Sequence, residues 1–192
     1  MSTEPVPSSA PALPFADPTP LGLLGLAIGC AALLPIAFGK ALTPAGFQTA
    51  AWFCLLFGGG CQFLAGLMAL ANKNALGGTL FTTFAFNWVM NNWALSGIAE
   101  GRIPDPTILL SVDLCFLVIF LVLMGAFGFY SSLLFLFLLD IVALYGLRIA
   151  RELTHTLALN VPIALCTALL AAIALWLAFA GLVNGAAGRP IF

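Results

Sequence analysis

The sequence predicts an all-α integral membrane protein whose six transmembrane helices form one compact bundle. Of its 192 residues, 62% are hydrophobic and only 7% are charged, and the mean hydropathy is +1.14. Soluble domains carry roughly 25% charged residues, so the charges present here cannot cover a soluble surface. Apolar runs of about 20 residues, the length that crosses a bilayer as a helix, recur along the chain, and no strand-like alternation of period 2 indicates a β-barrel.

The first two predicted spans are residues 21–38 and 47–71. The first is entered through Asp17-Pro18-Thr19-Pro20, where a proline suits the first helical turn and an oxygen-bearing side chain can cap it. The second ends at Asn72-Lys73-Asn74. Residues 1–16, rich in Pro, Ser and Ala, lack the basic start of a signal peptide and are predicted to be a disordered tail.

Four further spans complete the predicted domain of residues 17–189. A loop carrying Pro104-Asp105-Pro106 separates the third span from the fourth, and a polar stretch at residues 148–160 separates the fifth from the sixth. Residues 190–192 form a short C-terminal tail. Because the linkers are short, we expect antiparallel neighbours and both termini on one side. These spans are residues 76–98, 107–127, 130–147 and 161–183.

The composition also excludes several functional classes. A net charge of −1 provides no phosphate-binding field, which argues against nucleic-acid binding. No Walker motif and no histidine occur in the spans, so neither ATP-driven transport nor enzymatic catalysis is indicated. His155, the only histidine, lies in a predicted loop, and the five cysteines form no CxxC pair, so we expect no metal site and no cofactor.

Glycines recur at helix-packing intervals in the first span. Gly22, Gly25 and Gly29 lie there, and the last two form a GxxxG pair. Small residues at this spacing let helix backbones approach closely, either within a subunit or between subunits. Packing within the subunit is the favoured interpretation of each glycine taken alone.

Four motifs, in order along the chain, resemble those of the acetate uptake transporter family. Residues 17–23, DPTPLGL, resemble its N-P-A-P-L-G-L opening, and residues 58–66, GGGCQFLAG, resemble its G-G-x-x-Q-x-x-A-G motif. Residues 74–82 have the spacing of its N-x-x-G-x-T-x-F-T segment, with a later tryptophan at Trp88. Asn184 and Gly188-Arg189 resemble its C-terminal N-x-x-x-G-R.

The resemblance implies a six-helix subunit, assembled as a homo-hexamer in the lipid bilayer, with a pathway for small monocarboxylates in each subunit. It also implies a cytoplasmic N-terminus. The charges indicate the opposite orientation, because Lys40, Arg102, Arg148 and Arg151 lie on the side away from the termini, against Lys73 and Arg189 on the near side. This margin is thin, so we expect the termini to be cytoplasmic, in the inner (plasma) membrane.

The resemblance also implies a narrowing formed by a Phe, a Leu and a Tyr. The corresponding positions here are Leu26, Leu138 and Phe84, which lie at similar depths in their spans. Replacement of Tyr by Phe84 removes a hydroxyl that could hold a carboxylate. The motifs offer Gln62, Thr82 and Thr83 as substrate-binding candidates, although an interhelical hydrogen bond is the favoured role of each taken alone.

Two acids within the spans have no place in the family pattern. Asp140 lies close to the midplane of its span, and Asp113 lies nearer one end. Inserting an aspartate at mid-bilayer costs ~3 kcal/mol, so such residues usually face the bundle interior and have a partner there. Asn87 and Asn91, one turn apart, are further substrate-binding candidates that could join these acids in a polar cluster, with Asp140 donating to one of the two amides. Interhelical hydrogen bonding is the favoured role of this cluster, and proton binding by Asp140 or Asp113 is the main alternative.

These observations favour a membrane channel or transporter for small monocarboxylates such as acetate. Succinate is a further candidate substrate, and transport is expected to be linked to protons. Two alternatives stay open. The same scaffold could conduct a different small solute, neutral or cationic, because two buried acids repel anions. The protein could also be a membrane sensor or structural subunit that conducts nothing.

Overall fold

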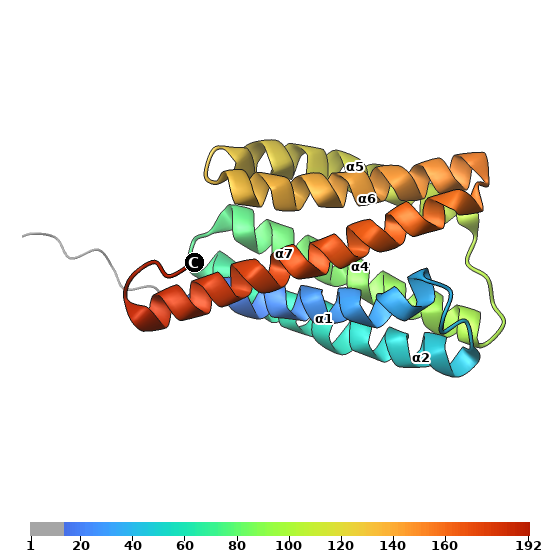
Figure 1. The fold of residues 1–192 in the computed structure, drawn as a ribbon, viewed down its shortest axis with the longest axis horizontal. Coiled ribbons are helices and arrows are strands. Elements are labelled where there is room, and N and C mark those ends of the chain that lie inside the picture. Colours follow the sequence, from blue (N-terminus) through green and yellow to red (C-terminus); the bar gives the residue numbers. More distant parts are fainter. Residues whose placement is uncertain (1–13) are drawn as a thin grey trace, which may run out of the picture.

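The computed structural model describes residues 14–192, so the predicted tail of residues 1–16 lies almost wholly outside the described residues. Figure 1 shows long helices running side by side, with α7 crossing the face of the bundle between α1 and the α5–α6 pair. The elements, in chain order, are α1 (Thr19–Ala37), α2 (Pro44–Phe53), η1 (Cys54–Cys61), α3 (Gln62–Ala71), α4 (Ala75–Ala99), α5 (Pro106–Gly128), α6 (Ser132–Thr154), η2 (Leu157–Leu159) and α7 (Asn160–Ala187).

The predicted fold class is confirmed. The described part of the chain is helical and contains no strand. Elements α2, η1 and α3 follow one another without a break, so the helices form six long segments. Five of these segments are long and apolar enough to cross a membrane. The sixth is α4, which has the length but carries several Thr and Asn side chains that lower its hydropathy.

Local sequence signals place the helix starts. The Thr43 hydroxyl accepts from the Gly46 N–H at 3.0 Å, directly before Pro44 at the first position of α2. In the same way Asn74 caps α4 through the Gly77 N–H at 2.9 Å, and Asp105 caps α5 through the Thr107 N–H at 2.8 Å. Each cap satisfies a backbone donor that the first helical turn leaves unpaired.

The fifth span extends further than the sequence indicated. Helix α6 continues past residue 147 to Thr154, so Arg148 and Arg151 belong to the helix and not to a loop. Arginine and glutamate are good helix formers, and the apolar pattern ends before the helix does. The chain then reverses at His155, which adopts a left-handed conformation with φ of 52°. As a result two guanidinium groups are carried on the helix surface, facing neighbouring helices.

Close packing through glycine joins α1 to its neighbours. A Cβ added at Gly25 would lie 2.5 Å from Cys61 Cβ, and one at Gly29 would lie 3.0 Å from the Trp88 ring. A Cβ at Gly22 would meet the Phe81 ring at 2.6 Å. All three glycines therefore pack against side chains of their own subunit.

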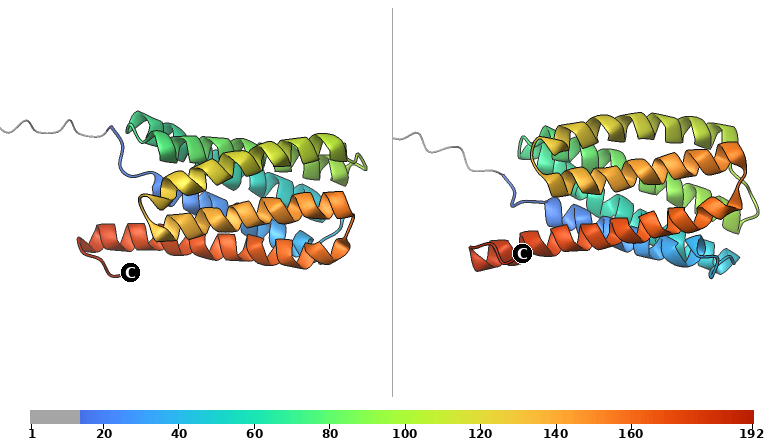
Figure 2. Two further views of the ribbon diagram at one scale, coloured as in Figure 1. Left: turned by 90° about the horizontal axis from the view of Figure 1, so that it is seen from above. Right: turned by 45° about the horizontal axis from the view of Figure 1, so that its top comes forward.

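The described chain begins and ends at the same end of the bundle (Figure 2). Phe15 is held there by Asn72, whose side chain accepts from the Phe15 N–H at 3.1 Å and donates to its carbonyl at 3.0 Å. The start of the described chain is thus fixed to the α3–α4 turn.

Candidate functional site

The three residues expected to form a narrowing are all buried in the core of the bundle, each on a different helix. Leu26 of α1, Phe84 of α4 and Leu138 of α6 are 1%, 3% and 0% exposed. They belong to one cluster of buried side chains, which also includes Phe120 of α5. The centroid of the Phe84 ring lies 4.8 Å from that of Phe120.

An aromatic series that the sequence reasoning missed extends this cluster along the bundle. The Phe120 ring centroid lies 5.3 Å from that of Tyr145 on α6 and 5.9 Å from that of Phe116, one turn away on α5. The spacing of Phe116 and Phe120 indicates a shared helix face, but nothing in the sequence shows that Tyr145 meets them. Phe84, Phe120 and Tyr145 therefore form a continuous line of rings across α4, α5 and α6.

Gln62 and Trp88 place polar atoms in the apolar core. Gln62, the first residue of α3, is 1% exposed, and Trp88 of α4 is 3% exposed. Among residues 14–192 neither the Gln62 Oε1 nor the Trp88 Nε1 has a hydrogen-bond partner. The Trp88 indole is pressed against Gly58 of η1, where an added Cβ would lie 2.4 Å from Cδ2. The structure thus holds a free amide oxygen and a free indole N–H inside the bundle.

The two threonines differ from each other in their hydrogen bonding. Thr82 is half-buried, and its hydroxyl donates to the Gly78 carbonyl of its own helix at 2.7 Å. Thr83 is also half-buried, and within the described chain its hydroxyl forms no hydrogen bond. Of the two hydroxyls, only that of Thr82 is engaged by the backbone of its own helix.

The asparagines of α4 differ in burial and in hydrogen bonding. Asn87 is buried and Asn91 is half-buried. The adjacent Asn92 donates to the Ala51 carbonyl of α2 at 2.9 Å and so ties α4 to α2. An interhelical hydrogen bond was expected from Asn87 or Asn91, and the structure gives one to Asn92.

Asp140 lies apart from these asparagines. It is 7% exposed, and its Oδ2 has no hydrogen-bond partner in residues 14–192. Its nearest titratable neighbours are Cys166 of α7, which interacts with the carboxyl, and Cys30 of α1. No hydrogen bond joins it to the amides of α4, contrary to the expected arrangement, because α6 packs between α5 and α7 whereas α4 packs against the α2–η1–α3 segment.

Asp113 has a partner that the sequence did not reveal. Its Oδ1 lies 3.0 Å from Nη2 of Arg148. The expected cluster of Asp113, Asp140 and Asn91 is therefore replaced by an ion pair between α5 and α6. The reason is the extension of α6, which brings the Arg148 guanidinium alongside the first turns of α5.

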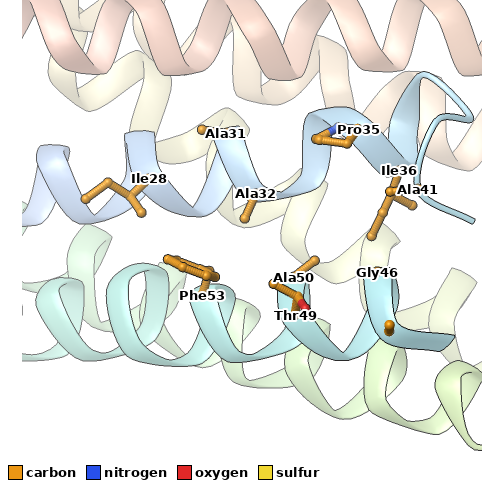
Figure 3. Close-up of a pocket in the computed structure, with 11 residues that line it drawn as sticks. Ile28, Ala31, Ala32, Pro35, Ile36, Ala41, Gly46, Thr49, Ala50 and Phe53 are labelled. Carbon is orange, nitrogen blue, oxygen red and sulfur yellow. The ribbon is translucent and has the colours of Figure 1, made fainter. Parts of the chain in front are cut away.

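A separate apolar groove of about 500 Å³ lies between α1 and α2 (Figure 3). Figure 3 shows Ile28 and Ala32 on the side of α1 that faces Phe53 of α2. None of the candidate site residues lines this groove, and Thr49 is its one polar side chain. It is separate from the buried cluster around Phe84.

Comparison with known structures identifies the arrangement of the helices. No protein-family model matches the sequence, and no curated protein sequence is similar to it. The solved structure of the bacterial acetate channel SatP matches with a TM-score of 0.84 and 22% sequence identity, covering 93% of this chain and 98% of that one. The two chains share one fold. The likeness to SatP extends over the six long helical segments, including those that carry the buried cluster.

Proposed function

We propose that the chain forms a membrane channel or transporter for small monocarboxylates such as acetate. The proposal is supported by a bundle that shares the SatP fold over almost its full length, with Leu26, Phe84 and Leu138 all in its buried apolar cluster. The structure also weakens the main argument for a cationic solute. Arg148 neutralises the charge of Asp113. Among the fully buried side chains of residues 14–192, Asp140 is the only acid.

Uptake of labelled acetate into liposomes containing the purified protein tests the proposal. Protein-free liposomes give the background from diffusion of acetic acid through lipid. Acetate uptake above that background, reduced by unlabelled acetate or succinate but not by urea or methylammonium, is the expected result. Competition by urea or methylammonium would favour the alternative solute class, and uptake equal to the background would favour a non-conducting protein.

We further propose that Asp140 links acetate movement to a proton. The carboxyl is buried, its Oδ2 has no hydrogen-bond partner in residues 14–192, and intramembrane acids commonly serve as proton relays. The other groups near it are the Cys166 and Cys30 thiols, and the Asp113–Arg148 pair lies further along α6. A carboxyl that takes up a proton as the anion passes would remove the repulsion between the two.

Asp140→Asn tests this proton linkage, because it keeps the size and a donor while removing the titrating group. Wild-type uptake should rise as the external pH falls, and the variant should show a flattened pH profile with normal folding. Glu152→Gln makes the same carboxyl-to-amide change on α6 and should keep the wild-type profile. A wild-type profile in Asp140→Asn would show that Asp140 only joins helices.

We also propose a hexameric assembly with both termini in the cytoplasm. Since Gly22, Gly25 and Gly29 pack within the subunit, the hexamer would rest on other surfaces. The orientation can be tested by fusing to the C-terminus a reporter enzyme that is active only in the periplasm. The fusion should be inactive if the C-terminus is cytoplasmic, and strong reporter activity would contradict the proposed orientation.

A further inference from the structure

The structure places a charged group and a buried hydroxyl side by side on α6. Nη2 of Arg148 lies 3.0 Å from Oδ1 of Asp113, and the guanidinium carbon lies 5.2 Å from the centroid of the Tyr145 ring. The Arg148 and Asp113 side chains are 28% and 13% exposed, so the pair is largely withdrawn from solvent. Tyr145 itself is 1% exposed.

This arrangement leaves hydrogen-bonding capacity unused. A guanidinium has five N–H donors in a planar fork, and here Asp113 engages it through a single pair of atoms. The Tyr145 hydroxyl has no hydrogen-bond partner anywhere in residues 14–192. A buried polar group without a partner is uncommon, and each instance calls for an explanation. A cationic fork next to a free hydroxyl is what a carboxylate needs, because charge-assisted hydrogen bonds to both of its oxygens become possible.

The position of these residues connects them with the buried narrowing. Tyr145 follows Leu138 by seven residues on α6, which is about 10 Å along a helix. The Tyr145 ring packs on Phe120, which in turn packs on Phe84, with centroid distances of 5.3 and 4.8 Å. The free hydroxyl and the guanidinium are thus reached from the narrowing along a continuous row of aromatic rings.

We propose that Tyr145 and Arg148 form a binding site for the carboxylate of the solute, and that Asp113 is the counter-ion that this carboxylate displaces. In the empty site Asp113 neutralises Arg148. The arriving carboxylate takes over the guanidinium and accepts from the Tyr145 hydroxyl. The next charged residues, Arg151 and Glu152, carry opposite charges, so Arg148 and Asp113 set the local balance. The site rests on the proposed function, because it concerns the specificity of the same pathway.

The test compares acetate with acetamide, its neutral counterpart of similar shape, in the liposome uptake assay. Tyr145→Phe should raise the half-saturation concentration for acetate by about tenfold, the value of a hydrogen bond to a charged group. Arg148→Gln should raise it at least as much. Asp113→Asn should lower it severalfold, because it removes the competing carboxylate. Any acetamide uptake through the protein should change far less than acetate uptake in all three variants, because acetamide carries no charge. Tyr130→Phe, at an exposed tyrosine, should behave as wild type.

A purely structural ion pair predicts different results. Asp113→Asn and Arg148→Gln would then destabilise the packing of α5 on α6 and lower the uptake of acetate and acetamide together. Tyr145→Phe would leave the uptake of both solutes unchanged. Each of these outcomes would refute the proposed site. If Arg148→Gln fails to fold, Tyr145→Phe and Asp113→Asn decide. Wild-type protein without acetate uptake above empty liposomes refutes the proposed function and the site with it, whereas normal wild-type uptake with unchanged variants refutes the site alone.

Discussion

Gly25 offers a quantitative test of how tightly α1 packs against η1. In Gly25→Ala the new Cβ would lie 2.5 Å from Cys61 Cβ and 2.6 Å from the carbonyl oxygen of Phe57. Carbon atoms in ordinary contact are about 3.5–4.0 Å apart, so α1 and η1 must separate by about 1 Å. The oxygen belongs to the backbone, so rotation of a side chain cannot relieve the clash.

Overpacking of this kind costs about 1–3 kcal/mol, and the better helix propensity of alanine returns up to ~1 kcal/mol. We therefore expect Gly25→Ala to lose about 1–2 kcal/mol of stability, which for a chain of this size corresponds to a melting temperature lower by roughly 2–8 °C. Because Leu26 moves with its neighbour, the variant should also change acetate uptake.

Thermal unfolding in mild detergent, followed by far-ultraviolet circular dichroism, measures the effect. Gly125→Ala is the matched control, because that glycine lies within α5 and an added Cβ would meet no atom within 4 Å. The control should melt at or above the wild-type temperature. If Gly25→Ala is as stable as Gly125→Ala, the close contact between α1 and η1 does not exist.

Three further predictions concern the narrowing, a helix cap and the assembly. Phe84→Ala should increase solute leak and relax size selectivity in liposomes, because a smaller side chain admits water to an apolar constriction; unchanged flux in the folded variant would place the narrowing elsewhere. Asp105→Ala should lower stability by about 1 kcal/mol in thermal unfolding, because two N–H groups of α5 lose their acceptor, and a neutral result would mean that water replaces the cap. Native mass spectrometry in mild detergent should show hexamers, and monomers alone would contradict the proposed assembly.

The helical framework could be predicted from the sequence because each signal acts locally. Apolar runs set the spans, and residues such as Thr43, Asn74 and Asp105 cap helices through atoms only two or three positions away. The end of α6 was harder to place, because Arg148 and Arg151 interrupt the apolar pattern without interrupting the helix. Hydropathy and helix formation are separate properties, and they diverge at that point.

The partners of the polar residues could not be predicted, because they depend on which helices pack together. Counting depth along each span put Asp113 near Asn91, although α5 packs mainly against α6 and so turns Asp113 toward Arg148. The same limitation hid Tyr145, whose ring meets Phe120 from another helix. Leu26, Phe84 and Leu138 were placed through the family resemblance, and their meeting in one cluster is compatible with the inferred narrowing.

The π-helical turns of η1 shift the phase of everything that follows them in the second segment. An α-helix turns by about 100° per residue, so each residue that a π-turn adds rotates the next stretch by about that angle relative to an unbroken helix. Gln62 comes directly after η1, and its inward direction depends on this offset. If the same residues formed regular α-helical turns in place of the π-turns, the amide of Gln62 would rotate out of the core. The π-turns of η1 therefore direct the amide of Gln62 into the core, and Gly58 among them leaves room for the Trp88 ring.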